Sequence, residues 1–273
     1  MTQLASDAIW RRRLDKIDNR VDDIRLPDDS DLDQDREWCE VRVEGNERRI
    51  RFHDYHEIYR VPGFYEELFY QRLKCCSPSC VAHLLQEVVV DFGHAPEDFR
   101  VLDLGAGNGM VGEEMTSRGA DLVVGADIIP EARAAALRDR PGVYDDYLVT
   151  DFTDLPKKQE QKIRGQRLNC LTCVAALGYG DIPPLAFLKA LDLIETPGWV
   201  GFNIKETFLR GDDTTGFNGL IRQLLDEEFM RAECYRRYRH RNTVAGDPLY
   251  YVAIVTCKLK DVSRELFEQW EAE

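Results

Sequence analysis

The fold of this chain is decided by the stretch VLDLGAGNGM, which runs from Val101 to Met110. Its apolar start predicts a buried strand, its three glycines predict a tight turn, and the residues that follow predict a helix over 109–118. Glycine is needed in this turn because a side chain would obstruct a ligand that approaches the main chain, and because positive φ values are expected there. Donors at the start of the helix then face the ligand. The stretch therefore predicts a ligand site between a strand and a helix.

Outward from this site, strands alternate with helices, which is typical of a parallel sheet covered on both faces. The expected strands are 101–104, 122–126, 147–150, 168–174 and 199–204, and the expected helices are 109–118, 130–138, 183–194 and the apolar stripe over 217–229. Two further strands, over about 233–242 and 249–258, flank a turn at 245–248 and predict an antiparallel hairpin. We predict an α/β fold with a Rossmann-like, seven-stranded, mostly parallel sheet, a C-terminal antiparallel hairpin and helices on both faces.

The first part of the chain has a different pattern. Apolar residues at helical spacing from Trp10 to Ile24 predict an amphipathic helix that Pro27 ends. Strands over 38–43 and 48–52 around the turn 44–47 predict a short hairpin, and helices are expected over about 54–73, with a break near Pro62, and over 78–90. We therefore divide the sequence into an N-terminal extension and helical cap (1–99) and a ligand-binding domain (100–273).

Composition and charge exclude several classes of protein. The 273 residues are 44% hydrophobic and 32% charged, which fits a large globular core and excludes a disordered chain. Fifty acidic and 36 basic side chains give a net charge of −14, so the surface repels polyanions, and binding to nucleic acid or an anionic membrane is not expected. The longest uncharged run, Leu168 to Gly180, is shorter than the roughly 20 residues of a membrane span. Residues 1–10 do not resemble a secretory signal, and we expect a cytoplasmic protein.

Eight cysteines are expected to be reduced thiols rather than a disulfide framework. Cys75, Cys76, Cys80 and His83 are spaced as zinc ligands could be, but they lie at the predicted start of a helix, where cysteines act more often as small buried apolar residues. Cys170 and Cys173 lie on a predicted strand, where positions i and i+3 point to opposite faces. We predict no metal site.

Acidic residues at the ends of the first three parallel strands help to distinguish between two classes of ligand. The glycines alone leave two alternatives, because Gly107 to Gly112 also fits the dinucleotide pattern, with Asp127 about 20 residues further on. A carboxylate at Asp103 would repel a pyrophosphate but could hold the ammonium group of S-adenosylmethionine. Asp127 can accept hydrogen bonds from ribose hydroxyls, Ile128 can cover the adenine, and Asp151-Phe152 offers an acceptor for the adenine amino group and an aromatic wall. An acidic site favours the sulfonium cofactor.

These motifs resemble those of the class I S-adenosylmethionine-dependent methyltransferases. The similarity rests on residues 101–109, on Gly-Ala-Asp-Ile at 125–128 and on Val-Thr-Asp-Phe at 149–152, and it covers about 52–258. The chain is most similar to the small methyltransferase-like proteins of the Williams-Beuren region type, through Phe52, Tyr55, Tyr59 and Ala175-Ala176-Leu177. The resemblance implies S-adenosyl-L-methionine as the cofactor. It implies cofactor contacts at Asp103, Gly105, Ala106, Gly107, Asn108, Asp127, Ile128, Asp151, Phe152 and Val174.

The methyl acceptor is expected at loops that follow the carboxyl ends of the strands. Transfer from a sulfonium is a direct displacement that depends on alignment, so a base is not obligatory. Tyr179 and Asp181 are the candidate catalytic residues, and Lys205-Glu206-Thr207 is a second loop at this edge. The segment with His53, Tyr55, Tyr59 and Tyr65 could form a lid, although its spacing also fits packing, and Asp181 could simply cap the next helix.

We predict a methyltransferase that acts on an O, N, S or C atom of a small molecule. The Asn/Asp-Pro-Pro-aromatic sequence of adenine-N6 and glutamine-N5 methyltransferases is absent after the fourth strand, which argues against DNA bases. Arginines from Arg231 to Arg241 alternate along a strand and favour a solvated edge over an anionic-substrate site. Two alternatives remain: an NAD-dependent oxidoreductase, and a protein that binds S-adenosylmethionine or a protein partner without catalysis.

Overall fold

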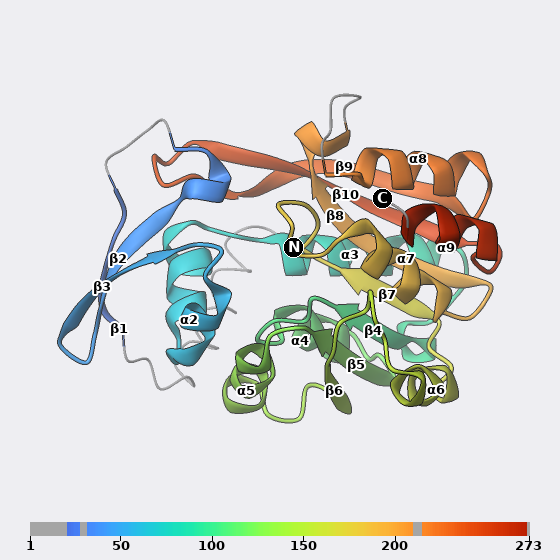
Figure 1. Ribbon diagram of the computed structural model, residues 1–273, viewed down its shortest axis with the longest axis horizontal. Coiled ribbons are helices and arrows are strands. Elements are labelled where there is room, and N and C mark those ends of the chain that lie inside the picture. Colours follow the sequence, from blue (N-terminus) through green and yellow to red (C-terminus); the bar gives the residue numbers. More distant parts are fainter. Residues whose placement is uncertain (1–20, 28–31, 210–214, 272–273) are drawn as a thin grey trace.

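The computed structural model describes residues 21–27, 32–209 and 215–271. Its centre is a seven-stranded sheet with the order β6-β5-β4-β7-β8-β10-β9 (Figure 1). Strands β4 to β8 pair in parallel, and β10 is antiparallel to β8 and to β9. The predicted Rossmann-like sheet with a C-terminal antiparallel hairpin is confirmed. The strands are β4 (Arg100–Leu104), β5 (Leu122–Asp127), β6 (Asp146–Val149), β7 (Cys170–Cys173), β8 (Gly198–Lys205), β9 (Met230–Asn242) and β10 (Pro248–Lys258).

Helices cover both faces of this sheet because its central strands are apolar on both sides. Along β4, Val101 packs against the first layer of helices and Leu102 packs against the second. The first layer consists of α3 (Ser77–Asp91), α4 (Met110–Ser117) and α5 (Pro130–Asp139). The second consists of α6 (Lys157–Gly165), α7 (Pro184–Asp192), α8 (Phe217–Asp226) and α9 (Arg264–Glu271). None of the helices in the described ranges is long and apolar enough to span a membrane.

The N-terminal cap contains its own small sheet, with β2 between β1 and β3. Strands β2 (Trp38–Val43) and β3 (Asn46–Arg51) form the predicted hairpin. The prediction of a helix from Trp10 to Ile24 is wrong at its end, because Val21–Arg25 forms strand β1. Ile24 is buried where β1 pairs with β2, so tertiary pairing overrides the helical spacing. The rest of that predicted helix lies outside the described residues.

Two short helices of the cap lie between its small sheet and the large one. They are α2 (Tyr55–Arg60) and a π-helix (Glu66–Arg72), and the break near Pro62 falls between them as predicted. Helix α2 lies beside α5 (Figure 1), and Arg138 of α5 donates to the main-chain oxygen of Tyr59. Helix α3 precedes residue 100 but packs on the large sheet, so the cap that stands apart from the sheet consists of β1 to β3, α2 and the π-helix.

A buried ion pair fixes the cap to the C-terminal hairpin. The carboxylate of Glu37 pairs with the guanidinium of Arg241 and accepts a hydrogen bond from the main-chain nitrogen of Val244 at 2.8 Å. Both charged side chains are almost fully buried. This contact joins residues far apart in the sequence and sets the cap over the carboxyl edge of the sheet.

Candidate functional site

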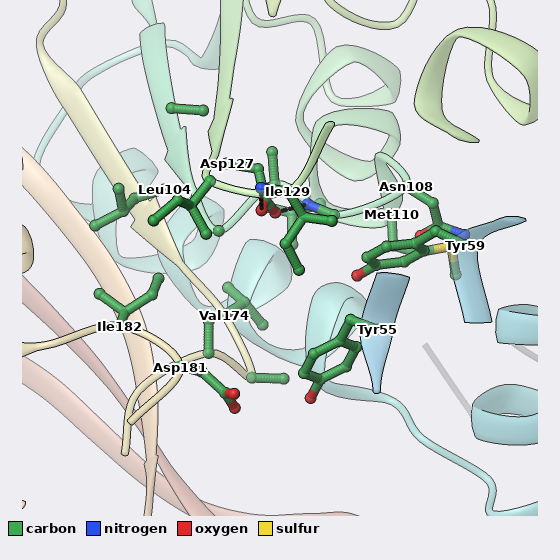
Figure 2. A pocket seen from close by; sticks show the side chains of 18 of the residues that line it. Tyr55, Tyr59, Leu104, Asn108, Met110, Asp127, Ile129, Val174, Asp181 and Ile182 are labelled. Atoms are coloured by element: carbon green, nitrogen blue, oxygen red, sulfur yellow. Dashed lines mark hydrogen bonds between the residues drawn. The ribbon is translucent and has the colours of Figure 1, made fainter. Parts of the chain in front are cut away.

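A cavity of about 140 Å³ lies between the cap and the carboxyl ends of the parallel strands. Its floor follows β4, β5, β6 and β7, and its roof is formed by tyrosines of the cap (Figure 2). We call it the larger cavity. Nine of the predicted cofactor residues line it: Gly105, Ala106, Gly107, Asn108, Asp127, Ile128, Asp151, Phe152 and Val174.

The glycine loop has the conformation that the sequence requires. Gly105, Gly107 and Gly109 have φ values of +71°, +52° and +93°. A Cβ atom on Gly107 would lie 2.5 Å from the hydroxyl oxygen of Tyr59, and one on Gly105 would lie 2.8 Å from a methyl carbon of Ile182. Glycine therefore serves both the turn and the close approach of the cap to the main chain.

Asp127, at the end of β5, supports this loop. One carboxylate oxygen accepts a hydrogen bond from the main-chain nitrogen of Gly107 at 2.9 Å, and the other accepts one from that of Ile129 at 2.9 Å (Figure 2). Burial raises the pKa of Asp127, while these main-chain donors oppose the shift. The carboxylate has four lone pairs, so it keeps capacity to accept a further hydrogen bond from a hydroxyl group.

The end of β6 supplies the next wall. Asp151 accepts hydrogen bonds at one oxygen from the main-chain nitrogen and the hydroxyl of Thr153, at 2.8 and 2.7 Å. Phe152 is buried, whereas Ile128 on the neighbouring loop is 56% exposed at the cavity wall. Two apolar side chains thus lie beside an acceptor, an arrangement that suits a flat heterocycle with an amino group.

The larger cavity is acidic. Asp127, Asp151 and Asp181 are among its described lining residues, and those residues include no lysine, arginine or histidine. A cationic ligand is therefore favoured over an anionic one of similar shape.

Asp103 is not where the sequence places it. Strand side chains alternate between faces, and this carboxylate points into the layer of α3 and α4 rather than into the cavity. Its oxygens accept hydrogen bonds from the hydroxyls of Tyr144 at 2.7 Å and Thr172 at 2.9 Å. Burial raises its pKa to about 7. Direct contact with an ammonium group is not supported by this geometry, and Asp103 is instead a buried support beneath the glycine loop.

A second buried carboxylate holds the loop from the cap. One oxygen of Glu66 accepts hydrogen bonds from the amide of Asn108 and from Arg140, both at 2.7 Å. Arg140 also donates to the main-chain oxygen of Asn108 at 3.1 Å. These hydrogen bonds could not be predicted from the sequence because the three residues come from separate elements.

Several lining residues were not predicted as cofactor contacts. Tyr55, Tyr59, Tyr65 and Tyr70 form the cap wall, and Ile182 faces the glycine loop. The first three tyrosines were candidates for a lid, and their rings form a stack with centroid distances of 6.0 and 5.4 Å. Helical spacing signals an apolar face but does not indicate which cavity that face covers.

A smaller cavity of about 40 Å³ adjoins the larger one and shares Tyr55, Tyr65, Ala175 and Asp181 with it. Asp181 thus lines both cavities. Tyr179, the other catalytic candidate, lines only the smaller cavity and donates a hydrogen bond to Gln34 at 3.0 Å. The loop after β7 therefore brings both candidates to the cap side of the site.

The arginines of β9 differ in their surroundings. Arg236 pairs with Glu87 and Arg237 pairs with Glu206 at the exposed part of this outer strand, which fits the predicted solvated edge. Arg241, near the end of the strand, is buried, pairs with Glu37 and lines the smaller cavity, so the prediction is wrong there.

Over the described ranges, no group of three or more His, Cys, Asp or Glu side chains is arranged to hold a metal ion. The sulfur atoms of Cys76 and Cys80 lie 3.4 Å apart as free thiols.

Comparisons with known proteins give structural neighbours only. No family model and no curated protein matches the sequence. Many solved structures align with it, and three of them are named here. One is magnesium protoporphyrin IX methyltransferase from Synechocystis with bound S-adenosylmethionine, with a TM-score of 0.46 and 15% identity over 66% of this chain and 79% of that chain. Another is N-methyltransferase NodS from Bradyrhizobium japonicum with S-adenosylhomocysteine, with a TM-score of 0.48 and 12% identity over 66% of this chain and 86% of that chain. The third is ribosomal protein L11 methylase from Lactobacillus delbrueckii, with a TM-score of 0.44 and 17% identity over 67% of this chain and 79% of that chain. Similarity at this level assigns no reaction to this chain.

Proposed function

We propose that this protein binds S-adenosyl-L-methionine in the larger cavity and transfers its methyl group to a small molecule. The main observation behind the proposal is that the cavity beside the glycine loop is lined by acidic side chains. Three carboxylates and no basic side chain among the described lining residues suit a ligand that carries a sulfonium cation. The glycine loop also places main-chain groups at the cavity wall, where they can contact the amino-acid tail of that ligand.

The residues of the sheet edge divide the work of binding. Asp127 would accept hydrogen bonds from the two ribose hydroxyls, as its position at the end of β5 and its free lone pairs allow. Ile128 and Phe152 would cover the adenine, and Asp151 would accept from its amino group. When bound, the cofactor supplies an electrophilic methyl group on sulfur.

The cap supplies enclosure. Tyr55, Tyr59 and Tyr65 cover the cavity from the cap side, with the Tyr59 hydroxyl against Gly107, and reduce its contact with water. The rate of methyl transfer increases mainly when the acceptor atom, the methyl carbon and the sulfur are aligned and when water is excluded. A covered cavity of this size favours a small acceptor over a folded macromolecule.

The same features weigh against a nicotinamide dinucleotide. Its pyrophosphate would face Asp127, Asp151 and Asp181, with no arginine or lysine among the described lining residues to offset the repulsion. Two like charges about 4 Å apart cost on the order of 1 to 4 kcal/mol at the effective dielectric of a protein surface or water.

Calorimetric titration tests the binding step. The full chain should bind S-adenosylhomocysteine with measurable heat and should give none with NADH. Binding of NADH without S-adenosylhomocysteine would support the oxidoreductase instead. Retention of S-adenosylhomocysteine without transfer of label from S-adenosylmethionine to any component of a metabolite extract would support a protein that binds the cofactor without catalysis.

A further inference from the structure

The cap side of the site contains a histidine–carboxylate pair that the sequence did not identify. The Nδ1 atom of His53 lies 3.1 Å from a carboxylate oxygen of Asp181. His53 comes from the segment before α2 and Asp181 from the loop after β7, so the pair forms only in the folded chain. The two side chains are 21% and 26% exposed, so solvent or a small ligand can reach them.

The hydrogen bond determines which nitrogen of His53 is available. A neutral ring that donates its Nδ1 proton to Asp181 has an unshared electron pair at Nε2. Within the described residues, Nε2 of His53 accepts and donates no hydrogen bond. Imidazoles oriented by a carboxylate in this way act as proton acceptors in many enzymes. The pair therefore has the form of a general base.

The position of the pair places it at the junction of the two cavities. Asp181 lines both cavities, and His53 lines the smaller one. The His53 ring lies 5.8 Å from the Tyr55 ring and 5.5 Å from the Tyr179 ring, measured between centroids. A ligand that extends from the larger cavity into the smaller one therefore comes beside the His53 ring.

The walls around this junction favour a flat acceptor. Tyr55, Tyr65 and Tyr70 line the cap side of the larger cavity, and Phe52 and Phe69 line the smaller one. Aromatic side chains of this kind bind planar rings by stacking and edge contacts. The smaller cavity, at about 40 Å³, has room for a reacting group and not for a ring, so the ring belongs in the larger cavity.

Charges of both signs lie around the smaller cavity. Asp181 lines it, and so does Arg241, which is paired with Glu37. Nζ of Lys205 donates a hydrogen bond to the hydroxyl of Tyr179 at 2.5 Å, and in the described part of the chain no carboxylate lies within salt-bridge distance of Lys205. Lys205 is thus the cation that can offset the negative charge of a phenolate formed beside Asp181.

We propose that Nε2 of His53 accepts the proton of an aromatic hydroxyl group on the methyl acceptor, while Asp181 holds the imidazole in position. The inference rests on the proposed methyltransferase function and deepens it. In the methyl transfer, the acceptor oxygen forms a bond to the methyl carbon and its hydroxyl proton moves to Nε2. The carbon–sulfur bond breaks, and its electron pair stays on sulfur. The acceptor class is therefore a small phenol, and the product is its methyl ether.

The test uses 4-nitrophenol, whose phenolate absorbs visible light while the phenol does not. It is added to the full chain saturated with S-adenosylhomocysteine, in buffer near the pKa of the free phenol. The wild-type complex should bind the probe and increase its phenolate band, and with S-adenosylmethionine it should form 4-nitroanisole. His53→Gln should abolish the increase and lower turnover about 100-fold or more. Asp181→Asn should act in the same direction with a smaller loss.

Controls separate this inference from the proposed function and from misfolding. His56→Gln changes an exposed histidine of the same segment and should leave both readouts unchanged. His53→Gln, at a residue that lines only the smaller cavity, should keep the wild-type affinity for S-adenosylhomocysteine. The inference is overturned if the complex does not bind 4-nitrophenol, or if His53→Gln binds and methylates it as the wild type does. Absence of S-adenosylhomocysteine binding in the wild type would instead overturn the proposed function.

Discussion

The two walls of the site are built in different ways. The sheet wall consists of the glycine loop, Asp127 and Asp151, and its polar atoms contact main-chain groups close by in sequence or on the adjacent strand. The cap wall consists of side chains, and its key pair joins His53 to Asp181, 128 positions apart. In the proposed function, the sheet wall would therefore hold the cofactor through its main-chain geometry. The side chains of the cap wall could differ, and with them the acceptor, without a change in the sheet.

This difference implies that the two walls can be disturbed separately. The cap depends on buried side-chain contacts with the hairpin, and the sheet wall depends on the turn and on Asp127. Substitutions on one side should therefore change stability, and those on the other should change cofactor affinity. The following variants test that separation.

Glu37→Ala should have the largest effect, because it leaves the buried guanidinium of Arg241 without its carboxylate. We expect the free energy of unfolding to fall by about 3–5 kcal/mol. Urea unfolding measures the change. Glu40→Ala, three positions further on in β2, removes an exposed pair with Arg49 and should cost less than about 1 kcal/mol. Equal losses in the two variants would contradict the view that one buried pair fixes the cap.

Asp103→Asn should change the pH dependence of stability. Burial raises the pKa of Asp103 to about 7 in the folded protein, against about 4 in an unfolded chain. Between these values the folded state keeps a proton that the unfolded state has lost, so the free energy of unfolding of the wild type falls as the pH rises. The asparagine variant lacks this decline, and the difference in the free energy of unfolding should amount to about 4 kcal/mol across the interval.

Urea unfolding at several pH values checks this expectation. Rearranged hydrogen bonds with Tyr144 and Thr172 can lower the free energy of unfolding by the same amount at every pH. Such a loss shifts the plot of free energy against pH without altering its slope. Asp247→Asn, at an exposed turn, should run parallel to the wild type. Parallel curves for Asp103→Asn would show that Asp103 is ionised throughout and is not the buried support described above.

Asp127→Ala should weaken the binding of S-adenosylhomocysteine about 30- to 100-fold, or about 2–3 kcal/mol. The substitution removes the acceptor proposed for the ribose and also the partner of two main-chain N–H groups. Calorimetry measures the affinity. Asp91→Ala, an exposed carboxylate at the end of α3, should bind as the wild type does. Undiminished affinity in Asp127→Ala would remove the sheet wall from the proposed cofactor site.

Gly107→Ala should have the smallest effect, a loss of about tenfold in affinity for S-adenosylhomocysteine, or about 1.4 kcal/mol. The added methyl group meets the hydroxyl of Tyr59, so it disturbs a place where the two walls are in close contact. Tyr59→Phe in the same chain should restore part of the affinity. Gly45→Ala has a similar positive φ with open space around it and should leave affinity unchanged. No recovery in the double variant would indicate that backbone strain alone causes the loss.

The site followed from the sequence to the extent that its signals were local. The turn at Gly105–Gly109 and the carboxylates after β5 and β6 could be placed because parallel strands end at one edge of a sheet. Asp103 obeyed the same spacing and still faced away, because alternation along β4 directs it to the hydroxyls of Tyr144 and Thr172. The spacing of motifs in the sequence predicts which residues lie at the carboxyl edge of the sheet. It does not determine the face of the sheet to which each side chain points.

The sequence by itself determined the strand–turn–helix unit, the parallel sheet and the closing hairpin, because glycine, periodic apolar residues and turn residues act through neighbours a few positions away. The tertiary structure alone decided that Val21–Arg25 forms a strand, that Glu66 reaches Asn108, and that His53 meets Asp181. Each of these outcomes depends on a partner distant in the sequence, and nothing in the spacing of one segment specifies the segment against which it packs.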